Sequence, residues 1–404
     1  MAIRKRAWTT KKGKHEAWIV DYADQGGNRR HKTFPRKRDA EEYAAATRVQ
    51  IGEGTHVADS ASRYVKDAGD LWLASARAAK LEQSTLDQYE QHLRLHILPF
   101  IGREKLSQLT VPLVRAFQDR LDSEGRSSAM IRAIIGSLGA MLGDAQERGL
   151  VVRNAVRELR GRRRRGSSTQ DRHKKRLKVG VDIPTPEEIR AIIAHATPRW
   201  RLVLMGAVFT GLRASELRGL RWDDVDLRKC ELHVRQRADR YNRIGPPKSA
   251  AGDRVIPLPP TVVKELSEWK LICPKSDGKI ALVFPNGAGN VESHVNIVQR
   301  GLVPAMLAAG IIKPVLDEKG VAMRDEDGKP LVGPKYGGLH VLRHFFASWC
   351  INRKEDGGQG LPPKVVQERL GHSSITMTMD TYGHLFPRGD DGSELAAAEK
   401  LLLG

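Results

Sequence analysis

The chain has 404 residues and 40% hydrophobic side chains. It contains no stretch of the roughly 18 to 20 apolar residues that would be expected to span a membrane. Its 68 basic and 48 acidic residues give a formal charge of +20, which favours a polyanionic partner, nucleic acid ahead of an anionic membrane. No apolar signal segment opens the chain and its three cysteines form no C-x-x-C pair, so we expect a reducing cytoplasm, without a disulfide framework or zinc ribbon.

Residues 1–60 predict a small α+β domain. Apolar side chains alternate with polar ones around Trp18, and the stretch "QGGN" supplies a turn, which is typical of a β-hairpin. The returning strand is expected to carry Arg30 and Lys32 on one face, where they would contact DNA phosphates. The stretch "RDAEEYAAATRVQ" then predicts a helix capped by Asp39.

Residues 64–160 predict a compact all-α domain of four or five helices. Three of these helices have clear start or stop signals. The first is expected to begin at a Ser84 cap and stop at Pro99, the second to run from a Thr110 cap to Gly125, and the third to end on Gly149.

A strongly basic stretch follows, with twelve basic and two acidic residues between Val151 and Gly180. Such a run cannot build a core, so residues 161–180 predict a linker. Two interpretations remain open: a solvated tether or localisation signal, and a belt that crosses a phosphate backbone. The position between two folded parts favours the belt, which would use Arg162, Arg163, Arg164 and Arg165.

Residues 181–404 predict a mixed, mainly helical domain with a small antiparallel sheet. A capping box at Thr185 and Glu188 starts its first helix. The stretches "KCELHVRQ" and "DRVIPLP" are typical of strands, and helices resume from His294. Residues 313–338 indicate a charged hairpin insertion, which is either a solvated loop or a contact with DNA or a neighbouring subunit. The tail "SELAAAEKLLL" predicts a short amphipathic helix, too short to be stable alone.

Four short stretches of the mixed domain carry chemically useful side chains at distinct spacings. They are "TGLRASELRGLRWDD", "PPKSAAGDRVIPLP", "GLHVLRHFFASW" and "LGHSSITMTMDTYGHLF". Each stretch alone is a weak signal, because a helical Arg–Glu pair or a lone histidine usually has a structural role. Taken together, the four stretches supply an ordered set of side chains: Arg213 with Glu216, Lys248, His340 with Arg343, His372, and Tyr382.

This ordered set resembles the tyrosine recombinase family, the phage-type site-specific integrases. That family has an arginine in T-G-x-R-x-x-E, a lysine in a β-turn, H-x-x-R, and L-G-H followed about ten residues later by a tyrosine. The resemblance covers residues 181–390. It extends more loosely to residues 64–160, as a core-DNA-binding domain, and to the first sixty residues, as an arm-DNA-binding domain.

The chemistry of a phosphodiester agrees with this resemblance. Charge builds on its non-bridging oxygens during substitution, and Arg213 and Arg343 could each clamp those oxygens in a bidentate way. Tyr382 would attack phosphorus and form a covalent 3′-phosphotyrosine, so that strand exchange becomes two ester exchanges. No metal or other cofactor is expected, because cationic side chains replace the metal pair of two-metal nucleases.

The resemblance implies roles for the remaining groups. Lys248 is the family's general acid for the leaving 5′-oxygen. His340 and His372 are expected to donate to phosphoryl oxygens, with His340 also assisting proton removal from the tyrosine. Glu216 is expected to hold an arginine or histidine in place. A structural role is expected for His344, and none is assigned to His384.

The implied partners are double-stranded DNA at core and arm attachment sites and a homotetramer in the synaptic complex. A directionality factor and a host DNA-bending protein are further implied partners, in the cytoplasm and nucleoid of a bacterial host. Phage or mobile-element DNA would be integrated into the host chromosome. Two alternatives stay open: a nicking-closing enzyme like the type IB topoisomerases, and a non-catalytic DNA-binding regulator. The regulator is disfavoured because all six catalytic groups are present.

Overall fold

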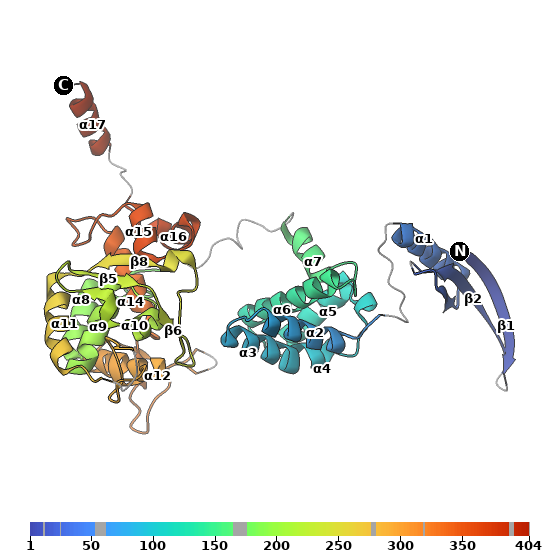
Figure 1. Cartoon of the computed structure of the whole chain (residues 1–404), viewed down its shortest axis with the longest axis horizontal. Coiled ribbons are helices and arrows are strands. Elements are labelled where there is room, and N and C mark those ends of the chain that lie inside the picture. Colours follow the sequence, from blue (N-terminus) through green and yellow to red (C-terminus); the bar gives the residue numbers. More distant parts are fainter. Residues whose placement is uncertain are drawn as a thin grey trace. The chain divides into compact units, whose positions relative to one another are not determined.

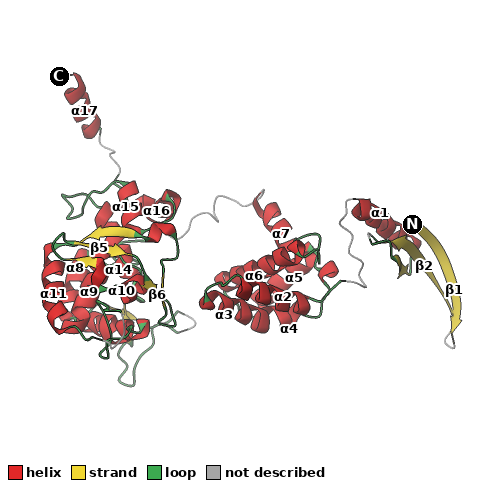
Figure 2. Ribbon diagram, in the orientation of Figure 1, coloured by secondary structure: helices red, strands yellow, loops and turns green. Residues whose placement is uncertain are grey.

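A computed structural model describes residues 1–10, 13–24, 26–52, 62–164, 176–275, 280–317, 320–387 and 392–403. The chain divides into two compact units, Met1–Arg172 and His173–Gly404. Two separate hydrophobic cores lie in the first unit, one beneath a small sheet and one within a helical bundle. The second unit is mainly helical and carries short strands (Figures 1 and 2).

The N-terminal sheet is antiparallel with the strand order β1-β2-β3, and one helix covers one of its faces. Val20 and Tyr22 of the sheet pack with Ala40 and Ala44 of the helix, because the alternation around Trp18 directs apolar side chains to a single face. The predicted hairpin is therefore confirmed. The elements are β1 (Ala2–Thr10), β2 (Gly13–Ala23), β3 (Arg29–Phe34) and α1 (Lys37–Gly52).

Two details of this part differ from the sequence prediction. The first strand, β1, pairs with β2 along its whole length and was not recognised, since its charged residues hide the alternation. The helix α1 begins at Lys37, so Asp39 lies in its first turn instead of capping it. An acidic side chain at that position still interacts favourably with the positive end of the helix dipole.

The helical bundle has one continuous core that includes Trp72, Phe117 and Leu138. The Thr110 cap is confirmed, since its hydroxyl accepts a hydrogen bond from the Leu113 amide, and Gly125 and Gly149 follow their helices with positive φ as expected. The helices are α2 (Val65–Ala78), α3 (Gln83–His92), α4 (Leu98–Ile101), α5 (Val111–Ser123), α6 (Ser128–Glu147) and α7 (Ala155–Arg164), with a π-helical turn at Leu93–Ile97.

Two predicted helix boundaries in the bundle are wrong. Helix α3 begins at Gln83 behind Glu82, so Ser84 lies inside it and caps nothing. The chain also remains helical past Pro99 as far as Ile101. The π-helical turn before Pro99 starts a new helical segment, and a proline in the first turn of a helix loses no hydrogen bond.

The predicted linker at 161–180 is shorter than expected. Helix α7 continues to Arg164, while Leu177 packs against the core of the second unit. Both ends of the linker therefore belong to folded parts, and residues 165–175 lie outside the described residues.

The second unit is organised around α9, which is buried along most of its length. Its helices before the sheet are α8 (Pro186–His195), α9 (Pro198–Thr210) and α10 (Ala214–Gly219). Those after the sheet are α11 (Pro260–Ile272), α12 (His294–Asn296), α13 (Val303–Ala308), α14 (His340–Ile351), α15 (Pro363–Leu370), α16 (Ile375–Tyr382) and α17 (Ser393–Leu403). The capping box of Thr185 and Glu188 at the start of α8 is confirmed.

Short strands cover one part of this helical unit. Three form an antiparallel sheet with the order β4-β5-β8, and two more form a hairpin between β5 and β8. Their bounds are β4 (Val225–Asp226), β5 (Glu231–Val234), β6 (Arg237–Ala238), β7 (Ile244–Gly245) and β8 (Arg254–Pro257).

The insertion before α14 is a hairpin, as predicted. Strands β9 (Ile312–Pro314) and β10 (Val332–Pro334) pair at its base, and Gly320 and Gly328 turn the chain with positive φ.

The tail helix α17 exposes Leu395 and Leu401 by 75% and 88%, so its apolar side chains stay uncovered in this single chain. In the part of the chain that the structure describes, no helix has the length and apolar character needed to cross a membrane.

Candidate active site

The end of α9 places the first arginine of the candidate site. Gly211 has a φ of 60°, and a Cβ there would lie 2.2 Å from Cδ1 of Phe346, so only glycine fits this close approach. Two residues later Arg213 caps α10. The guanidinium Nη1 of Arg213 donates to Glu216 Oε1 at 2.7 Å, as the three-residue spacing suggested.

Glu216 is 2% exposed and lies between two guanidinium groups. Its second oxygen accepts a hydrogen bond from Arg254 Nη2 at 2.9 Å. Burial raises the pKa of Glu216, but Arg254 and Arg213 outweigh burial and hold the pKa below its usual value. Glu216 is therefore an ionised anchor for two arginines.

The second arginine, Arg343, comes from the first turn of α14 and is 2% exposed. Its Nη1 donates to the Gly211 carbonyl at 2.6 Å, and its Nη2 donates to the Leu370 carbonyl. Burial, followed by the neighbouring charge of Arg213, lowers the pKa of Arg343 to about 9, so the group still carries its charge at neutral pH.

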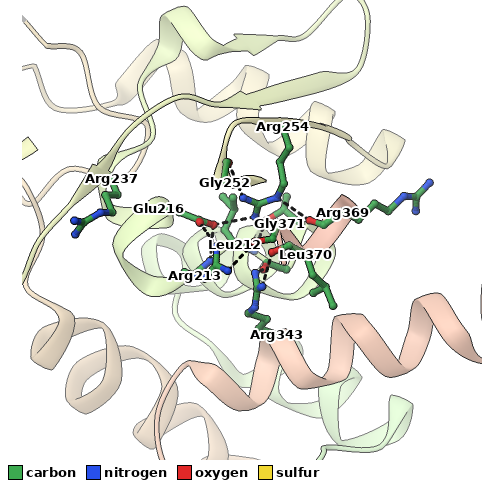
Figure 3. Close-up of polar contacts among 12 residues, drawn as sticks. Leu212, Arg213, Glu216, Arg237, Gly252, Arg254, Arg343, Arg369, Leu370 and Gly371 are labelled. Carbon is green, nitrogen blue, oxygen red and sulfur yellow. Dashed lines mark hydrogen bonds and ion pairs between the residues drawn. The ribbon is translucent and has the colours of Figure 1, made fainter. Parts of the chain in front are cut away.

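The C-terminal end of α15 is the common anchor of these arginines. Arg254 Nε donates to the carbonyl of Arg369 at 2.8 Å, and Arg213 Nη2 donates to that of Gly371 at 2.9 Å. With Arg343 on Leu370, three guanidinium groups bind three successive carbonyls at the negative end of a helix (Figure 3).

His372 follows this end directly and is buried. Its Nδ1 lies 2.9 Å from the hydroxyl of Thr378. Burial, and then the charges of Arg343 and Arg213, lower the pKa of His372 to about 4, so its ring is neutral at pH 7.

Tyr382 is the last residue of α16 and is 2% exposed. Burial raises its pKa to about 12, against the opposing charge of Arg343. The His344 Nδ1 atom lies 2.7 Å from the tyrosine hydroxyl oxygen. Burial, and next electrostatic repulsion by His340 and by the guanidinium of Arg343, lower the pKa of His344 to about 4.

The expectation that His340 assists the tyrosine needs correction. The His340 ring lies edge-on to His344, with 4.6 Å between centroids, and His344 is the histidine within hydrogen-bonding distance of Tyr382. His344, for which a structural role is expected, is thus the histidine that contacts Tyr382. His384, to which no role was assigned, lies 2.7 Å from the carbonyl of Leu177 through its Nε2.

Lys248 lies in the loop between β7 and β8, as its position in a turn predicted, and its side chain is exposed. The structure thus brings five of the six predicted catalytic residues to one place and carries the sixth on an adjoining loop. Sequence reasoning missed Arg254, which was taken only as part of a strand. The available signal was a charge at a core-facing position of β8, on the same face as Ile256.

The predicted DNA contacts of the N-terminal sheet are on the helix-covered face. Val20 pairs with Lys32 and Tyr22 with Arg30, and these apolar partners pack on α1. Arg30 Nε donates to Asp24 at 2.9 Å, and Lys32 Nζ lies 4.5 Å from the ring centroid of Tyr43. The predicted placement of these two residues on one face is confirmed, whereas their contact with DNA stays a prediction.

The opposite face, which we call the open face, carries exposed basic side chains, although Ala17 and Ile19 on it are buried. The strand register places Arg4 opposite Ile19 and Arg6 opposite Ala17 on it, and Trp8 opposite His15. Arg29 and His31 of β3 share this face.

Of the predicted linker contacts, Arg162, Arg163 and Arg164 fall in α7, and Arg165 lies outside the described residues. Among the described residues, no group of three or more His, Cys, Asp or Glu side chains could hold a metal ion.

The fold and this cluster are those of a tyrosine recombinase, a class of DNA strand transferase. The chain belongs to the phage integrase family, whose sequence model matches residues 184–388. A second model, the phage integrase N-terminal SAM-like domain, matches residues 65–121.

Curated relatives and solved structures agree with this assignment. A "Tyrosine recombinase XerC-like" protein of Caldanaerobacter subterraneus is 25% identical over 342 residues, covering 79% of this chain and 80% of the relative. The "ICEBs1 integrase" of Bacillus subtilis is 25% identical and covers 78% of each chain.

Two solved structures share the fold. The Tn1549 transposon integrase in complex with transposon right end DNA has a TM-score of 0.60 and 20% identity, and covers 83% of this chain and 99% of that one. A lambda integrase tetramer bound to a Holliday junction has a TM-score of 0.51 and 17% identity, with 92% and 96% coverage.

Proposed function

We propose that this enzyme is a site-specific integrase that cuts and rejoins DNA through a covalent 3′-phosphotyrosine on Tyr382. The observation that carries the proposal is the hydrogen-bonding distance between Tyr382 and His344 beside the charged group of Arg343. A buried tyrosine with a raised pKa is a poor nucleophile unless a neighbouring group takes its proton.

Substitution at phosphorus requires positive charge on the non-bridging oxygens. Arg213 and Arg343 supply this charge. Glu216 and a backbone carbonyl hold the guanidinium of Arg213, and two backbone carbonyls hold that of Arg343. Fixed donors stabilise developing charge without reorganising during the reaction. The tautomer of His372 in which Nδ1 accepts from Thr378 carries its hydrogen on Nε2, and we propose that this tautomer supplies a further donor.

The proposed cleavage step moves one proton at each end of the breaking bond. The tyrosine hydroxyl loses its proton to His344 Nδ1 while its oxygen bonds to phosphorus. The bond from phosphorus to the 5′-oxygen breaks, and Lys248 protonates that leaving oxygen. Rejoining reverses each transfer, with the 5′-hydroxyl of another strand as the nucleophile. Guanidinium charge replaces a metal in this scheme, and no step involves a cofactor.

The proposed substrate is double-stranded DNA with core and arm sites. The relatives named as integrases of a phage and of an integrated element support phage or mobile-element DNA as the cargo. The open face of the N-terminal sheet would bind the arm sites through Arg6 and Arg29. A homotetramer would hold two core sites, and the bound DNA would place the enzyme at the host nucleoid.

The test is a recombination assay with two labelled DNA fragments, one from each side of the encoding gene. The proposal predicts joined fragments of new length that depend on matching repeats in both partners. Relaxation of any supercoiled plasmid without joined products would instead indicate a nicking-closing enzyme. Specific DNA binding without cleavage would indicate a regulator.

A further inference from the structure

We propose that Arg254 is a positioning residue that fixes the Lys248 loop relative to the arginine clamp. This inference rests on the proposed function, because it concerns how the general acid reaches the leaving oxygen. Arg254 is the first residue of β8, and its side chain is only 6% exposed. It touches no reacting atom itself.

Three acceptors surround the Arg254 guanidinium, and each belongs to a different part of the site. Nη2 donates to Glu216 Oε2 at 2.9 Å, Nη1 to the Gly252 carbonyl at 3.0 Å, and Nε to the Arg369 carbonyl at 2.8 Å. A planar guanidinium holds three such directions at once, which a lysine ammonium on a flexible stem cannot reproduce. Figure 3 shows this arrangement between α10, the loop and α15.

Each of these three acceptors is either bonded to a proposed catalytic residue or close to one in the chain. Glu216 is the ion-pair partner of Arg213 at 2.7 Å. The Arg369 carbonyl lies at the end of α15, three residues before His372. Gly252 belongs to the loop that carries Lys248. Arg254 therefore joins the loop of the general acid, through Gly252, to the clamp, through Glu216.

The loop itself is folded tightly enough to transmit this constraint. The Gly252 amide donates to the Ser249 carbonyl at 2.8 Å, which closes a turn directly after Lys248. On the other side, a Cβ at Gly252 would lie only 2.5 Å from Cβ of Pro247. Lys248 sits between these two contacts, so its backbone moves with Gly252.

The Arg254–Glu216 ion pair contributes more to positioning than to stability. A buried ion pair contributes little net stability, because desolvation offsets the attraction of the two charges. Placement of a general acid is far more sensitive, since a shift of about 1 Å can slow a reaction by ~10²-fold. Lys248 is carried by the loop that Arg254 holds at Gly252, so a loss of this bond would displace the general acid.

The test uses single-turnover cleavage of core-site DNA in two forms, one normal and one with a 5′-bridging phosphorothiolate. Sulfur leaves without a proton, so the second substrate needs no general acid. Arg254→Lys should cleave normal DNA at least ~10-fold more slowly than wild type, yet cleave the phosphorothiolate within ~3-fold of wild type. A merely structural role would slow both substrates equally, and that result would overturn the inference.

Two further variants make the outcome decisive. Gly252→Ala leaves the Arg254–Glu216 pair intact but forces the loop away from Pro247, so it should show the same selective loss; an equal loss on both substrates would again overturn the inference. Arg201→Lys is the matched control, because Arg201 is bidentate to Glu265 in the same unit, and it should affect neither substrate.

Lys248→Ala separates this inference from the proposed function. Rescue of that variant by the phosphorothiolate, without rescue of Arg254→Lys, would contradict the positioning role alone. Failure to rescue Lys248→Ala would instead remove the general-acid role on which the inference rests, and would overturn both.

Discussion

The Nδ1 atom of His344 lies 2.7 Å from the hydroxyl oxygen of Tyr382, while His340 reaches only the edge of the His344 ring. The tyrosine therefore has a proton acceptor in direct contact. The low pKa of His344, about 4, keeps its ring neutral and able to accept at pH 7. In this arrangement the proposed nucleophile and base come from α16 and α14, two helices that both pack against α15.

His344→Ala should slow cleavage by ~10²-fold, because the phenol then loses its proton to water. His344→Asn keeps an oxygen that can accept the tyrosine hydrogen bond, but it cannot take up the proton. We expect the asparagine variant to be nearly as slow as the alanine variant in single-turnover cleavage, with unchanged DNA affinity. A wild-type rate for His344→Asn would show that His344 only orients the ring.

The sequence could not distinguish the two histidines for a simple geometric reason. Residues 340 and 344 are four apart and share one face of α14, so helical periodicity treats them alike. Only the path of α16, which begins at Ile375, decides which ring contacts the tyrosine. By contrast, the Arg213–Glu216 pair and the Thr110 and Thr185 caps depend on neighbours within three residues, and the sequence predicted them correctly.

The other differences between the sequence predictions and the structure arise from contacts between residues far apart in the chain. The alternation of β3 showed that Arg30 and Lys32 share a face, but the sequence did not show which face α1 covers. Two of the three acceptors of Arg254, Glu216 and Arg369, lie 38 and 115 residues away, so the strand pattern could show that Arg254 faces the core but not which groups it contacts.

Arg6→Ala combined with Arg29→Ala should weaken binding of an arm-type DNA site. These residues lie on the open face of the N-terminal sheet, and loss of two phosphate contacts should flatten the salt dependence of binding by up to ~2 in slope. The paired control, Arg30→Ala with Lys32→Ala, removes as much charge from the helix-covered face. Equal loss of slope in both double variants would contradict the assignment of the open face.

Replacing Arg162, Arg163, Arg164 and Arg165 with alanine tests the basic stretch at the end of α7. If it crosses the DNA backbone, the salt dependence of core-site binding should flatten by up to ~4 in slope, at roughly 0.9 per lost contact. Sequence preference should stay the same, because phosphate contacts carry no base information. An unchanged slope in binding measured at several salt concentrations would support a solvated tether.

We predict that acid destabilises the second unit, because its buried histidines have lowered pKa values. The folded pKa of His344 is about 4, below the usual 6.5, so below pH 6.5 the unfolded chain binds protons that the folded chain excludes. Stability is therefore fully present above the usual pKa and falls as the pH is lowered. Between pH 7.5 and 5.5 the loss should be up to about 1 kcal/mol per such histidine.

Urea unfolding of the full chain at the two pH values measures this loss. His344→Asn removes one titrating group, so its unfolding free energy should fall less with acid than that of wild type, whatever its stability at pH 7.5. An identical decrease in both proteins would show that His344 does not contribute.

The central claim is that Tyr382 becomes covalently bonded to DNA, and trapping of the adduct tests it most directly. A core-site duplex with a nick beside the cleavage position lets the short 5′-hydroxyl fragment diffuse away, so the covalent complex accumulates. The account predicts an adduct that survives denaturation, is joined to the 3′-phosphate, and maps by peptide mass to Tyr382. Tyr382→Phe should bind the same DNA with similar affinity and form no adduct. An adduct formed by the phenylalanine variant, or mapped to another residue of the wild type, would contradict the account.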